Sequence, residues 1–256
     1  MKIASWNVNS LNVRLPHLQE WLRLQSPDVL GLQETKLEDS RFPDTALIEQ
    51  GYRSVFVGQK TYNGVAILSR EPASDVQYGI PGFADEQRRA IAATVGGVRI
   101  VNLYVVNGQS LGSDKYQYKL RWIDAVHAWL AEELCAYPDL VVLGDFNIAP
   151  EDRDVHDPVV WNDESVLTSV AERDALRRLQ ALGLHDSFRL HNQEAGHFSW
   201  WDYRAAGFRR NLGLRIDLVL VSEALRPRVI GSHIDREPRL WERPSDHAPV
   251  WVELAD

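Results

Sequence analysis

The sequence predicts an α/β protein in which helices cover the faces of one or two β-sheets. Three observations lead to this class. Short runs rich in β-branched residues recur along the chain, three segments repeat apolar residues at helical spacing, and 256 residues are enough for one large domain. We therefore expect about ten strands and three or more helices.

The expected strands are short and mostly bounded by Gly, Pro, Asn or Asp, which turn or end a strand. A first strand ends at Asn7, and others are expected at residues 28–33, 52–57, 65–68, 98–106, 140–143, 216–221 and 249–254. Two stretches without periodicity, residues 108–114 and 149–167, are interpreted as surface loops near a functional edge.

The expected helices repeat apolar side chains at intervals of three or four residues. Their apolar positions are Leu15, Leu18 and Leu22; Tyr118, Trp122, Val126, Leu130 and Leu134; and Ala175, Leu176, Leu179 and Leu182. The third helix has clear ends, because Ser169 and Glu172 fit a capping box and Gly183 fits a left-handed C-terminal cap. Cys135 falls in the second helical pattern, so we expect it to be buried and reduced.

Composition narrows the class of protein. A hydrophobic content of 45% with 25% charged residues is ordinary for a globular protein and argues against intrinsic disorder. No linker, membrane span or secretory signal stands out, so we expect one domain over residues 1–256 and a cytoplasmic location. The net charge of -8 means that a nucleic acid would need a local basic patch or a bound cation.

Acidic residues follow two apolar strands directly. Glu34 comes after residues 28–33, and Asp145 comes after the strand expected at 140–143. Two such carboxylates at one sheet edge can bind Mg²⁺, which prefers oxygen ligands and often takes only one or two carboxylates. The alternative is that each is an ordinary solvated acid at a strand end.

An acid and an imidazole stand together before the last strand, at Asp246 and His247. Asp217 lies among apolar neighbours, and a buried carboxylate is costly without a partner. An Asp217–His247 pair would fix the tautomer of the ring and leave its other nitrogen for a phosphate or a water. The alternative is an Asp217 bonded to backbone groups and a His247 on a surface loop.

Two asparagines have the same position at strand ends. Asn7 ends the first strand, and Asn147 follows Asp145, so both can donate to a phosphate oxygen or orient a metal ligand. Each alone is a common turn former. Their occurrence together with the acids and His247 favours one shared site.

A basic and aromatic segment bears on the substrate. Residues 203–216 contain Arg204, Arg209, Arg210 and Arg215 and no acid, directly after a stretch that includes Trp200. Such a surface suits phosphates together with sugars and bases, and Lys60 is a further candidate phosphate contact. The alternative is a solvated loop whose aromatic residues turn into the core.

Seven ordered segments resemble the signature blocks of the exonuclease III family of apurinic/apyrimidinic (AP) endonucleases. They are residues 6–11 (WNVNSL), 32–36 (LQETK), 58–60 with 62–66, 144–150 (GDFNIAP), 198–204 (FSWWDYR), 213–217 (GLRID) and 244–250 (PSDHAPV). The resemblance covers nearly the whole chain. The wider endonuclease/exonuclease/phosphatase superfamily shares only part of these blocks, so the rest indicates its DNA-repair branch.

The resemblance implies a four-layered α/β sandwich of two packed mixed sheets, like deoxyribonuclease I, forming a single catalytic domain. It also implies Mg²⁺-dependent hydrolysis of the phosphodiester 5′ to abasic sites in double-stranded DNA, 3′-5′ exonuclease activity and cleaning of blocked 3′ ends. Mn²⁺ would substitute for Mg²⁺, and the protein would act as a monomer.

The resemblance also implies roles for individual residues. Glu34 would be the main metal ligand, with Asn7, Asp145, Asn147 and Asp246 in or near the metal shell.

In catalysis, Asp217 would pair with His247 at the scissile phosphate, Asn147 would orient the nucleophile, and Tyr104 would hydrogen-bond a phosphate oxygen. Either Asp145 or His247 would be the general base. The residues implied in DNA binding are Lys60, Asn107, Trp200, Arg204, Arg209 and Arg210.

Two loops depart from the family pattern, at residues 105–113 and 151–166, so a member specialised as a 3′-5′ exonuclease and 3′-phosphatase is the main alternative. A phosphatase or phospholipase acting on small molecules or lipids, and a DNA-binding module without activity, are more distant alternatives.

Overall fold

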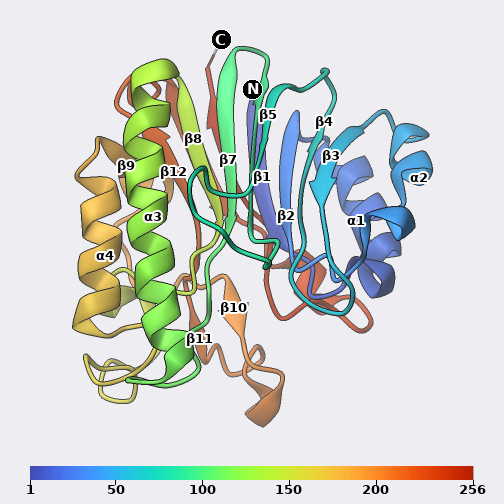
Figure 1. Ribbon diagram of the computed structural model, residues 1–256. Coiled ribbons are helices and arrows are strands. Elements are labelled where there is room, and N and C mark those ends of the chain that lie inside the picture. Colours follow the sequence, from blue (N-terminus) through green and yellow to red (C-terminus); the bar gives the residue numbers. More distant parts are fainter. Residues whose placement is uncertain (256) are drawn as a thin grey trace.

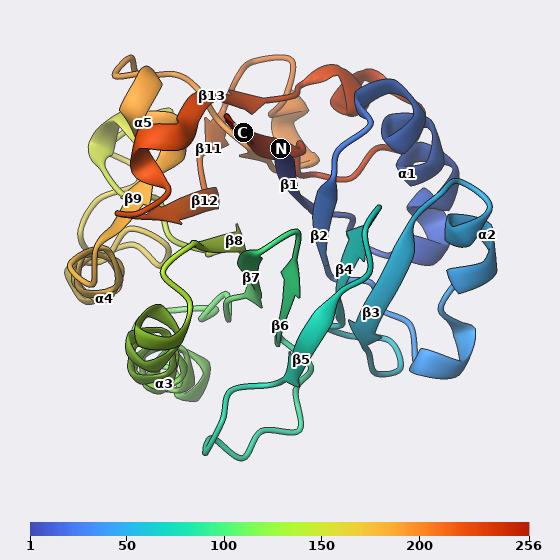
Figure 2. The ribbon, with the colours of Figure 1, turned by 90° about the horizontal axis from the view of Figure 1, so that it is seen from above.

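The computed structural model describes residues 1–255, and it consists of two six-stranded β-sheets packed face to face with helices on their outer surfaces (Figure 1). Seen from above, α1 and α2 lie outside one sheet and α3 and α4 lie outside the other (Figure 2). The expected four-layered α/β sandwich is confirmed.

The first sheet has the strand order β13-β14-β1-β2-β4-β3, with only β1 and β2 parallel. Its strands are β1 Lys2–Asn7, β2 Val29–Gln33, β3 Arg53–Val57, β4 Val65–Ser69, β13 Val229–Ile234 and β14 Val250–Leu254. The second sheet has the order β5-β6-β7-β8-β12-β9, with only β7 and β8 parallel. Its strands are β5 Ser74–Tyr78, β6 Ala90–Val95, β7 Val98–Tyr104, β8 Leu140–Asp145, β9 Leu184–Asp186 and β12 Asp217–Ser222.

Within residues 1–255, five helices and a short ribbon complete the fold. The helices are α1 Leu11–Gln25, α2 Asp44–Ile48, α3 Asp114–Ala136, α4 Val170–Gln180 and α5 Ser187–His191. The ribbon pairs β10 Trp200–Trp201 with β11 Gly213–Leu214 at the lower end of the molecule in Figure 1. Short 3₁₀ turns are η1 Asp39–Arg41, η2 Asp152–Asp154, η3 Arg204–Ala206, η4 Arg226–Arg228 and η5 Glu237–Leu240. None of the helices within residues 1–255 combines the length and apolarity needed to cross a bilayer.

Alternation along the strands builds three apolar layers. In β1, Ile3 faces the core between the sheets, whereas Ala4 packs toward α1. Trp122 of α3 and Leu176 of α4 cover the outer face of the second sheet. Because both faces of the central strands are buried, strands such as β4 (VAILS) and β8 (LVVLGD) are nearly continuous apolar runs.

The expected elements are present with shifted ends, and several strands were not predicted. The Ser169–Glu172 capping box begins α4, and Gly183 has the left-handed φ of 94°. Strands β5, β6, β9 and β13 were missed because they are exposed, rich in alanine, very short or interrupted by glycine. The burial predicted for Cys135 was wrong, since this free cysteine is exposed near the end of α3.

Candidate active site

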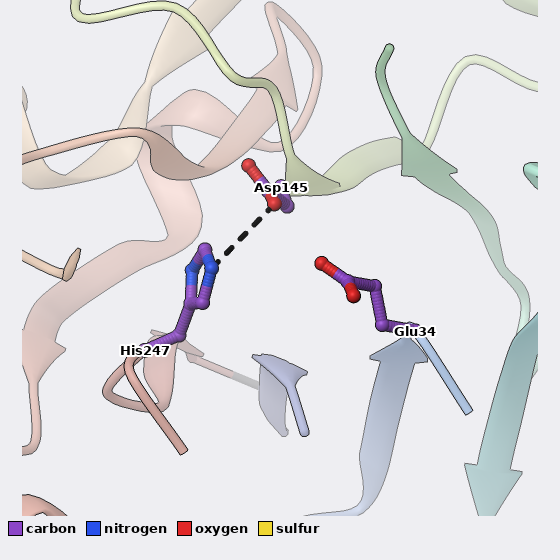
Figure 3. Close-up of side chains that lie close together, drawn as sticks. All are labelled: Glu34, Asp145 and His247. Carbon is purple, nitrogen blue, oxygen red and sulfur yellow. Dashed lines mark ion pairs between the residues drawn. The ribbon is translucent and has the colours of Figure 1, made fainter. Parts of the chain in front are cut away.

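The predicted site residues come together at one end of the sandwich, where strand ends from both sheets meet. Asn7 ends β1, Glu34 follows β2, and Asp145 ends β8. Asp217 begins β12, which is antiparallel to β8 and paired with it there, and His247 precedes β14. Figure 3 shows Glu34, Asp145 and His247 pointing toward a common space from three separate segments.

Three side chains form a compact cluster. One ligand atom from each of Glu34, Asp145 and His247 lies within 4.8 Å of the other two. Asn7 Nδ2 donates to Glu34 Oε1 and to Asp145 Oδ2, both at 2.9 Å, and so holds the carboxylates side by side. Lys36 Nζ lies 3.0 Å from Glu34 Oε2 and balances part of this negative charge.

The backbone takes unusual conformations to present these groups. Glu34 and Asn147 have left-handed φ values of 51° and 48°, a strain that is common at functional sites. Gly144 has a φ of 146°, and a Cβ there would lie 1.9 Å from the carbonyl oxygen of Leu103. Only glycine therefore allows β8 to pass this close to β7 just before Asp145.

The imidazole of His247 lies between two carboxylates. Its Nδ1 lies 2.9 Å from Asp217 Oδ2, and its Nε2 lies 3.8 Å from Asp145 Oδ2. Ser199 Oγ donates to Asp217 Oδ2 at 2.7 Å and fixes that acid in turn. The structure thus contains the expected Asp217–His247 pair and directs the other ring nitrogen toward Asp145.

The charges in this buried cluster shift its pKa values. Burial raises the pKa of Asp145 to about 7, where the His247 charge opposes the shift and the Asp217 and Glu34 charges add to it. Burial lowers the pKa of His247, but the charges of Asp217 and Asp145 outweigh burial and raise it to about 10.

For Glu34, burial raises the pKa, but Lys36 and Asn7 more than offset this and lower it. Burial and the Glu34 charge raise the pKa of Tyr104, so its hydroxyl stays a hydrogen-bond donor.

Asn147 lies beside Asp145 and is held firmly. Its backbone N–H donates to Asp145 Oδ1 at 2.9 Å, and its Nδ2 donates to the carbonyl oxygen of Val105 at 2.9 Å. Asn107 Nδ2 donates to Asn147 Oδ1 at 3.2 Å, so the two predicted asparagines are in contact.

The five expected metal-shell residues are not equivalent. Asn7 Oδ1 accepts the Asn9 N–H, so Asn7 presents its NH₂ group to the carboxylates. Both carboxylate oxygens of Asp246 accept hydrogen bonds, from Asn9 Nδ2 and Trp200 Nε1. Glu34 and Asp145 offer the hard carboxylate oxygens that suit Mg²⁺, so the donor set fits this cation.

A pocket opens in front of the cluster. It has a volume of about 310 Å³. We call the polar part of its lining the floor, which consists of Glu34, Tyr104, Asn107, Asp145, Asn147, Asp246 and His247. We call the apolar part the wall, whose residues belong to one hydrophobic cluster: Trp161, Val166, Leu167, Trp200 and Ile216.

A larger groove of about 1040 Å³ adjoins this pocket, and both are lined by Tyr104 and Asn107. Three cations line the groove: Arg89, Lys115 and Arg204. The acidic chain thus has a local basic surface directly beside the carboxylates.

The predicted basic residues separate into two groups. Arg204, Arg209 and Arg210 are exposed, as is Lys60, and only Arg204 among these four lines the groove. Arg215, expected to belong to the basic surface, is buried, and its guanidinium pairs with Asp154 and Asp186, each at 2.7 Å. The prediction that Arg215 belongs to the basic surface was therefore wrong.

Several residues of the site were not singled out from the sequence. Asn9, Lys36 and Ser199 each stand within two residues of a predicted site residue, and this proximity was the available signal. Trp161 lies within the loop of residues 151–166, and Lys115 lies just beyond the loop of residues 105–113. No local sequence pattern marks either residue.

Comparison with known proteins agrees with this geometry. Residues 4–247 match the Endonuclease/Exonuclease/phosphatase family. Exodeoxyribonuclease III of Haemophilus influenzae is 36% identical, over 99% of this chain and 100% of the relative. A 3′ phosphatase from Neisseria, solved with a product DNA hairpin, is 49% identical with a TM-score of 0.98, and each chain is covered over 100% of its length. An AP endonuclease from Archaeoglobus fulgidus is 38% identical with a TM-score of 0.95, over 99% of both chains. The chain thus belongs to the endonuclease/exonuclease/phosphatase family and, within it, to the nucleases of exodeoxyribonuclease III type.

Proposed function

We propose that this chain is a Mg²⁺-dependent phosphodiesterase that cleaves double-stranded DNA 5′ to abasic sites and processes 3′ ends. It would act as a monomer with one catalytic domain over residues 1–256. One observation carries the proposal: Glu34, Asp145 and His247 converge on a pocket that adjoins a groove lined by cations. One continuous surface then contains carboxylates that can bind a metal, an imidazole that can bind a phosphate, and cations that can bind a DNA backbone.

Glu34 and Asp145 would hold the Mg²⁺, and Asn7 would keep their carboxylates together through its two hydrogen bonds. The cation would neutralise charge on the phosphate and stabilise the leaving oxygen. Mn²⁺ is expected to substitute because it accepts the same oxygen ligands. Asp246 would act indirectly, by fixing Asn9 and the indole of Trp200.

Both ring nitrogens of His247 face carboxylates, so the ring would be held as an imidazolium. It would then donate to a phosphate oxygen and could not accept a proton from water. Asp145 is left as the group that takes the proton of the attacking water, with Asn147 fixing its carboxylate. Tyr104 would donate its hydroxyl proton to a second phosphate oxygen.

The pocket would receive a sugar at the cleaved position. Trp200 is fixed by Asp246 and forms part of the wall against which a base-free sugar or a terminal nucleotide would lie. Moving a base-free sugar out of the duplex avoids most of the unpairing cost of a few kcal/mol. Arg89, Lys115, Arg204 and Asn107 would hold the neighbouring phosphates along the groove.

A second candidate is an enzyme specialised for 3′ ends, with 3′-5′ exonuclease and 3′-phosphatase activity and little cleavage at abasic sites. It is favoured by the 49% identity to the Neisseria 3′ phosphatase, compared with 38% to the Archaeoglobus AP endonuclease. Both candidates use the same acids and the same imidazole. They differ in which DNA reaches the pocket.

The test uses a 5′-labelled duplex with one tetrahydrofuran abasic analogue, its undamaged twin, and a duplex with a 3′-phosphate. Each is incubated with enzyme in Mg²⁺ and in chelator, beside Asp145→Asn protein purified identically as a control for contaminating nucleases. A single Mg²⁺-dependent cut at the analogue supports the main proposal. A ladder or phosphate release without that cut supports the second candidate, and no cleavage in any duplex refutes both.

A further inference from the structure

A buried ion pair lies directly behind the pocket. Lys119 extends from α3 and Glu172 from the first turn of α4, and both side chains are 0% exposed. The two helices lie side by side on the outer face of the second sheet (Figure 2). Neither side chain lines the pocket, so the pair has no direct part in the chemistry above.

The ammonium group of Lys119 connects two pocket segments. Its Nζ donates to the carbonyl oxygen of Asn147 at 2.6 Å and to that of Asn107 at 3.1 Å. The remaining interaction is the ion pair with Glu172. One cation therefore joins the backbones of the two asparagines whose side chains contact each other beside Asp145.

The carboxylate of Glu172 connects a third segment. Its Oε1 accepts the Leu167 N–H at 3.1 Å, and its Oε2 accepts the N–H and the hydroxyl of Ser169 at 3.1 and 2.6 Å. Leu167 is part of the apolar wall of the pocket. The pair thus links the floor of the pocket to its wall through backbone contacts.

Gly108 allows this close packing. Its φ is 97°, and a Cβ there would lie 3.2 Å from Val166 Cγ2 and 3.3 Å from Lys119 Cδ. The loop after β7 therefore passes tightly between the Lys119 stem and the pocket wall, and a side chain at residue 108 would push these apart.

The stability of the fold alone does not explain why a buried ion pair occupies this position. Removing two charges from water is costly, and buried ion pairs can often be replaced by apolar side chains of similar size without loss of stability. An apolar pair would not bind two carbonyl oxygens and a backbone N–H in three separate segments. The distinctive effect of Lys119 and Glu172 is therefore on the relative positions of Asn107, Asn147 and Leu167.

We propose that Lys119 and Glu172 are positioning residues, which hold the floor and wall of the pocket in register for phosphodiester hydrolysis. The kinetic effect rests on the function proposed above. The effect on the backbone does not, because it can be measured without substrate or metal.

The test variant is Lys119→Met with Glu172→Gln. The double substitution removes both charges together. Met keeps the length of the lysine stem, and Gln keeps a hydrogen-bond acceptor for the cap of α4. Lys119→Met alone would leave a buried unpaired carboxylate, and its instability would obscure the result. The matched control is Arg178→Met with Asp124→Asn, which removes an exposed ion pair, at 2.8 Å, between the same two helices.

We expect kcat per folded molecule to fall about 10- to 100-fold, because small displacements of reacting groups have effects of this size. KM for DNA should change less than kcat, since the groove cations Arg89, Lys115 and Arg204 are unchanged. Hydrogen exchange in chelator should be faster at residues 105–109, 146–149 and 167–169 and unchanged elsewhere. The control variant should match wild type in both measurements.

Wild-type kcat and wild-type exchange in the Lys119→Met/Glu172→Gln protein would overturn the inference, as would a fall in activity that only follows the loss of folded protein. If the wild type cleaves no DNA, the proposed function fails, but the exchange experiment still decides whether the pair orders these segments.

Discussion

His247 Nδ1 lies 2.9 Å from Asp217 Oδ2, and this contact joins the two sheets of the sandwich. Asp217 begins β12 of the second sheet, whereas His247 stands before β14 of the first. An isolated bridge between Trp200 and His247 holds the backbone there. The orientation of the ring therefore depends on the packing of the two sheets, and sheet packing in a protein interior is rigid.

The first prediction concerns the residues that would move protons. Asp145→Asn and His247→Ala should each reduce kcat at least about 100-fold, because each removes a group that accepts or donates a proton at the phosphate. DNA affinity, measured by fluorescence anisotropy in chelator, should stay within about threefold because the cations of the groove remain. Activity near that of wild type in either variant would contradict the assigned role.

The second prediction concerns the metal. Chelator should abolish cleavage, and Glu34→Gln should raise the Mg²⁺ concentration for half-maximal activity at least about tenfold, because it removes a charged ligand. Glu38→Gln is the matched control, since Glu38 is an exposed acid four residues along the chain. A titration of activity against Mg²⁺ decides the matter, and equal curves for the two variants would place the metal elsewhere.

The third prediction concerns the groove. Arg204→Ala should lower the slope of log affinity against log salt concentration by about 0.9, the value for one lost phosphate contact. Arg209→Ala with Arg210→Ala should also lower the slope, since both are exposed on the same segment. Arg177→Ala on α4, where Arg177 pairs with Asp174, is the control and should leave the slope unchanged. An unchanged slope would mean that the substituted arginine does not contact DNA.

Much of this site could be predicted because each key side chain follows a recognisable strand. The apolar runs before Glu34 and Asp145 marked both the strand and its end, so the convergence of these acids was foreseeable. The strands β6 and β13 gave weaker signals, because an alanine-rich segment and one broken by glycine do not show the usual alternation.

Other features could not be read from local pattern. Arg204 and Arg215 stand in one basic segment, yet one is exposed and the other buried, because the partners of Arg215 come from distant segments. The burial of Lys119, in contrast, could have been inferred from the sequence. It lies on the buried stripe of α3 with Tyr116, Ile123 and Val126, and a lysine on such a stripe indicates a buried partner. That partner, Glu172, lies on another helix and could not be identified from spacing.

The last prediction concerns stability and pH. Burial raises the pKa of Asp154, but the charges of Arg215 and Arg189 outweigh burial and hold it below its usual range. A carboxyl with a lowered pKa stabilises the fold above the unfolded-state value of about 3.9, and this contribution is lost as the pH falls through the folded-state value. Arg215→Met should therefore lower the free energy of unfolding at pH 7 by about 3–5 kcal/mol, because it leaves Asp154 and Asp186 short of a partner.

The difference between wild type and Arg215→Met should shrink as the pH falls from 7 to 4, because loss of the Arg215 charge raises the pKa of the buried Asp154 and its carboxyl takes up a proton at a higher pH in the variant than in wild type. Urea unfolding at pH 7, 5 and 4 measures this difference directly. Arg226→Met removes an exposed arginine 3.6 Å from Glu223 and should change the free energy by less than about 1 kcal/mol at every pH. A constant difference across the three pH values would show that Arg215 stabilises the fold by packing and not through the charge of Asp154.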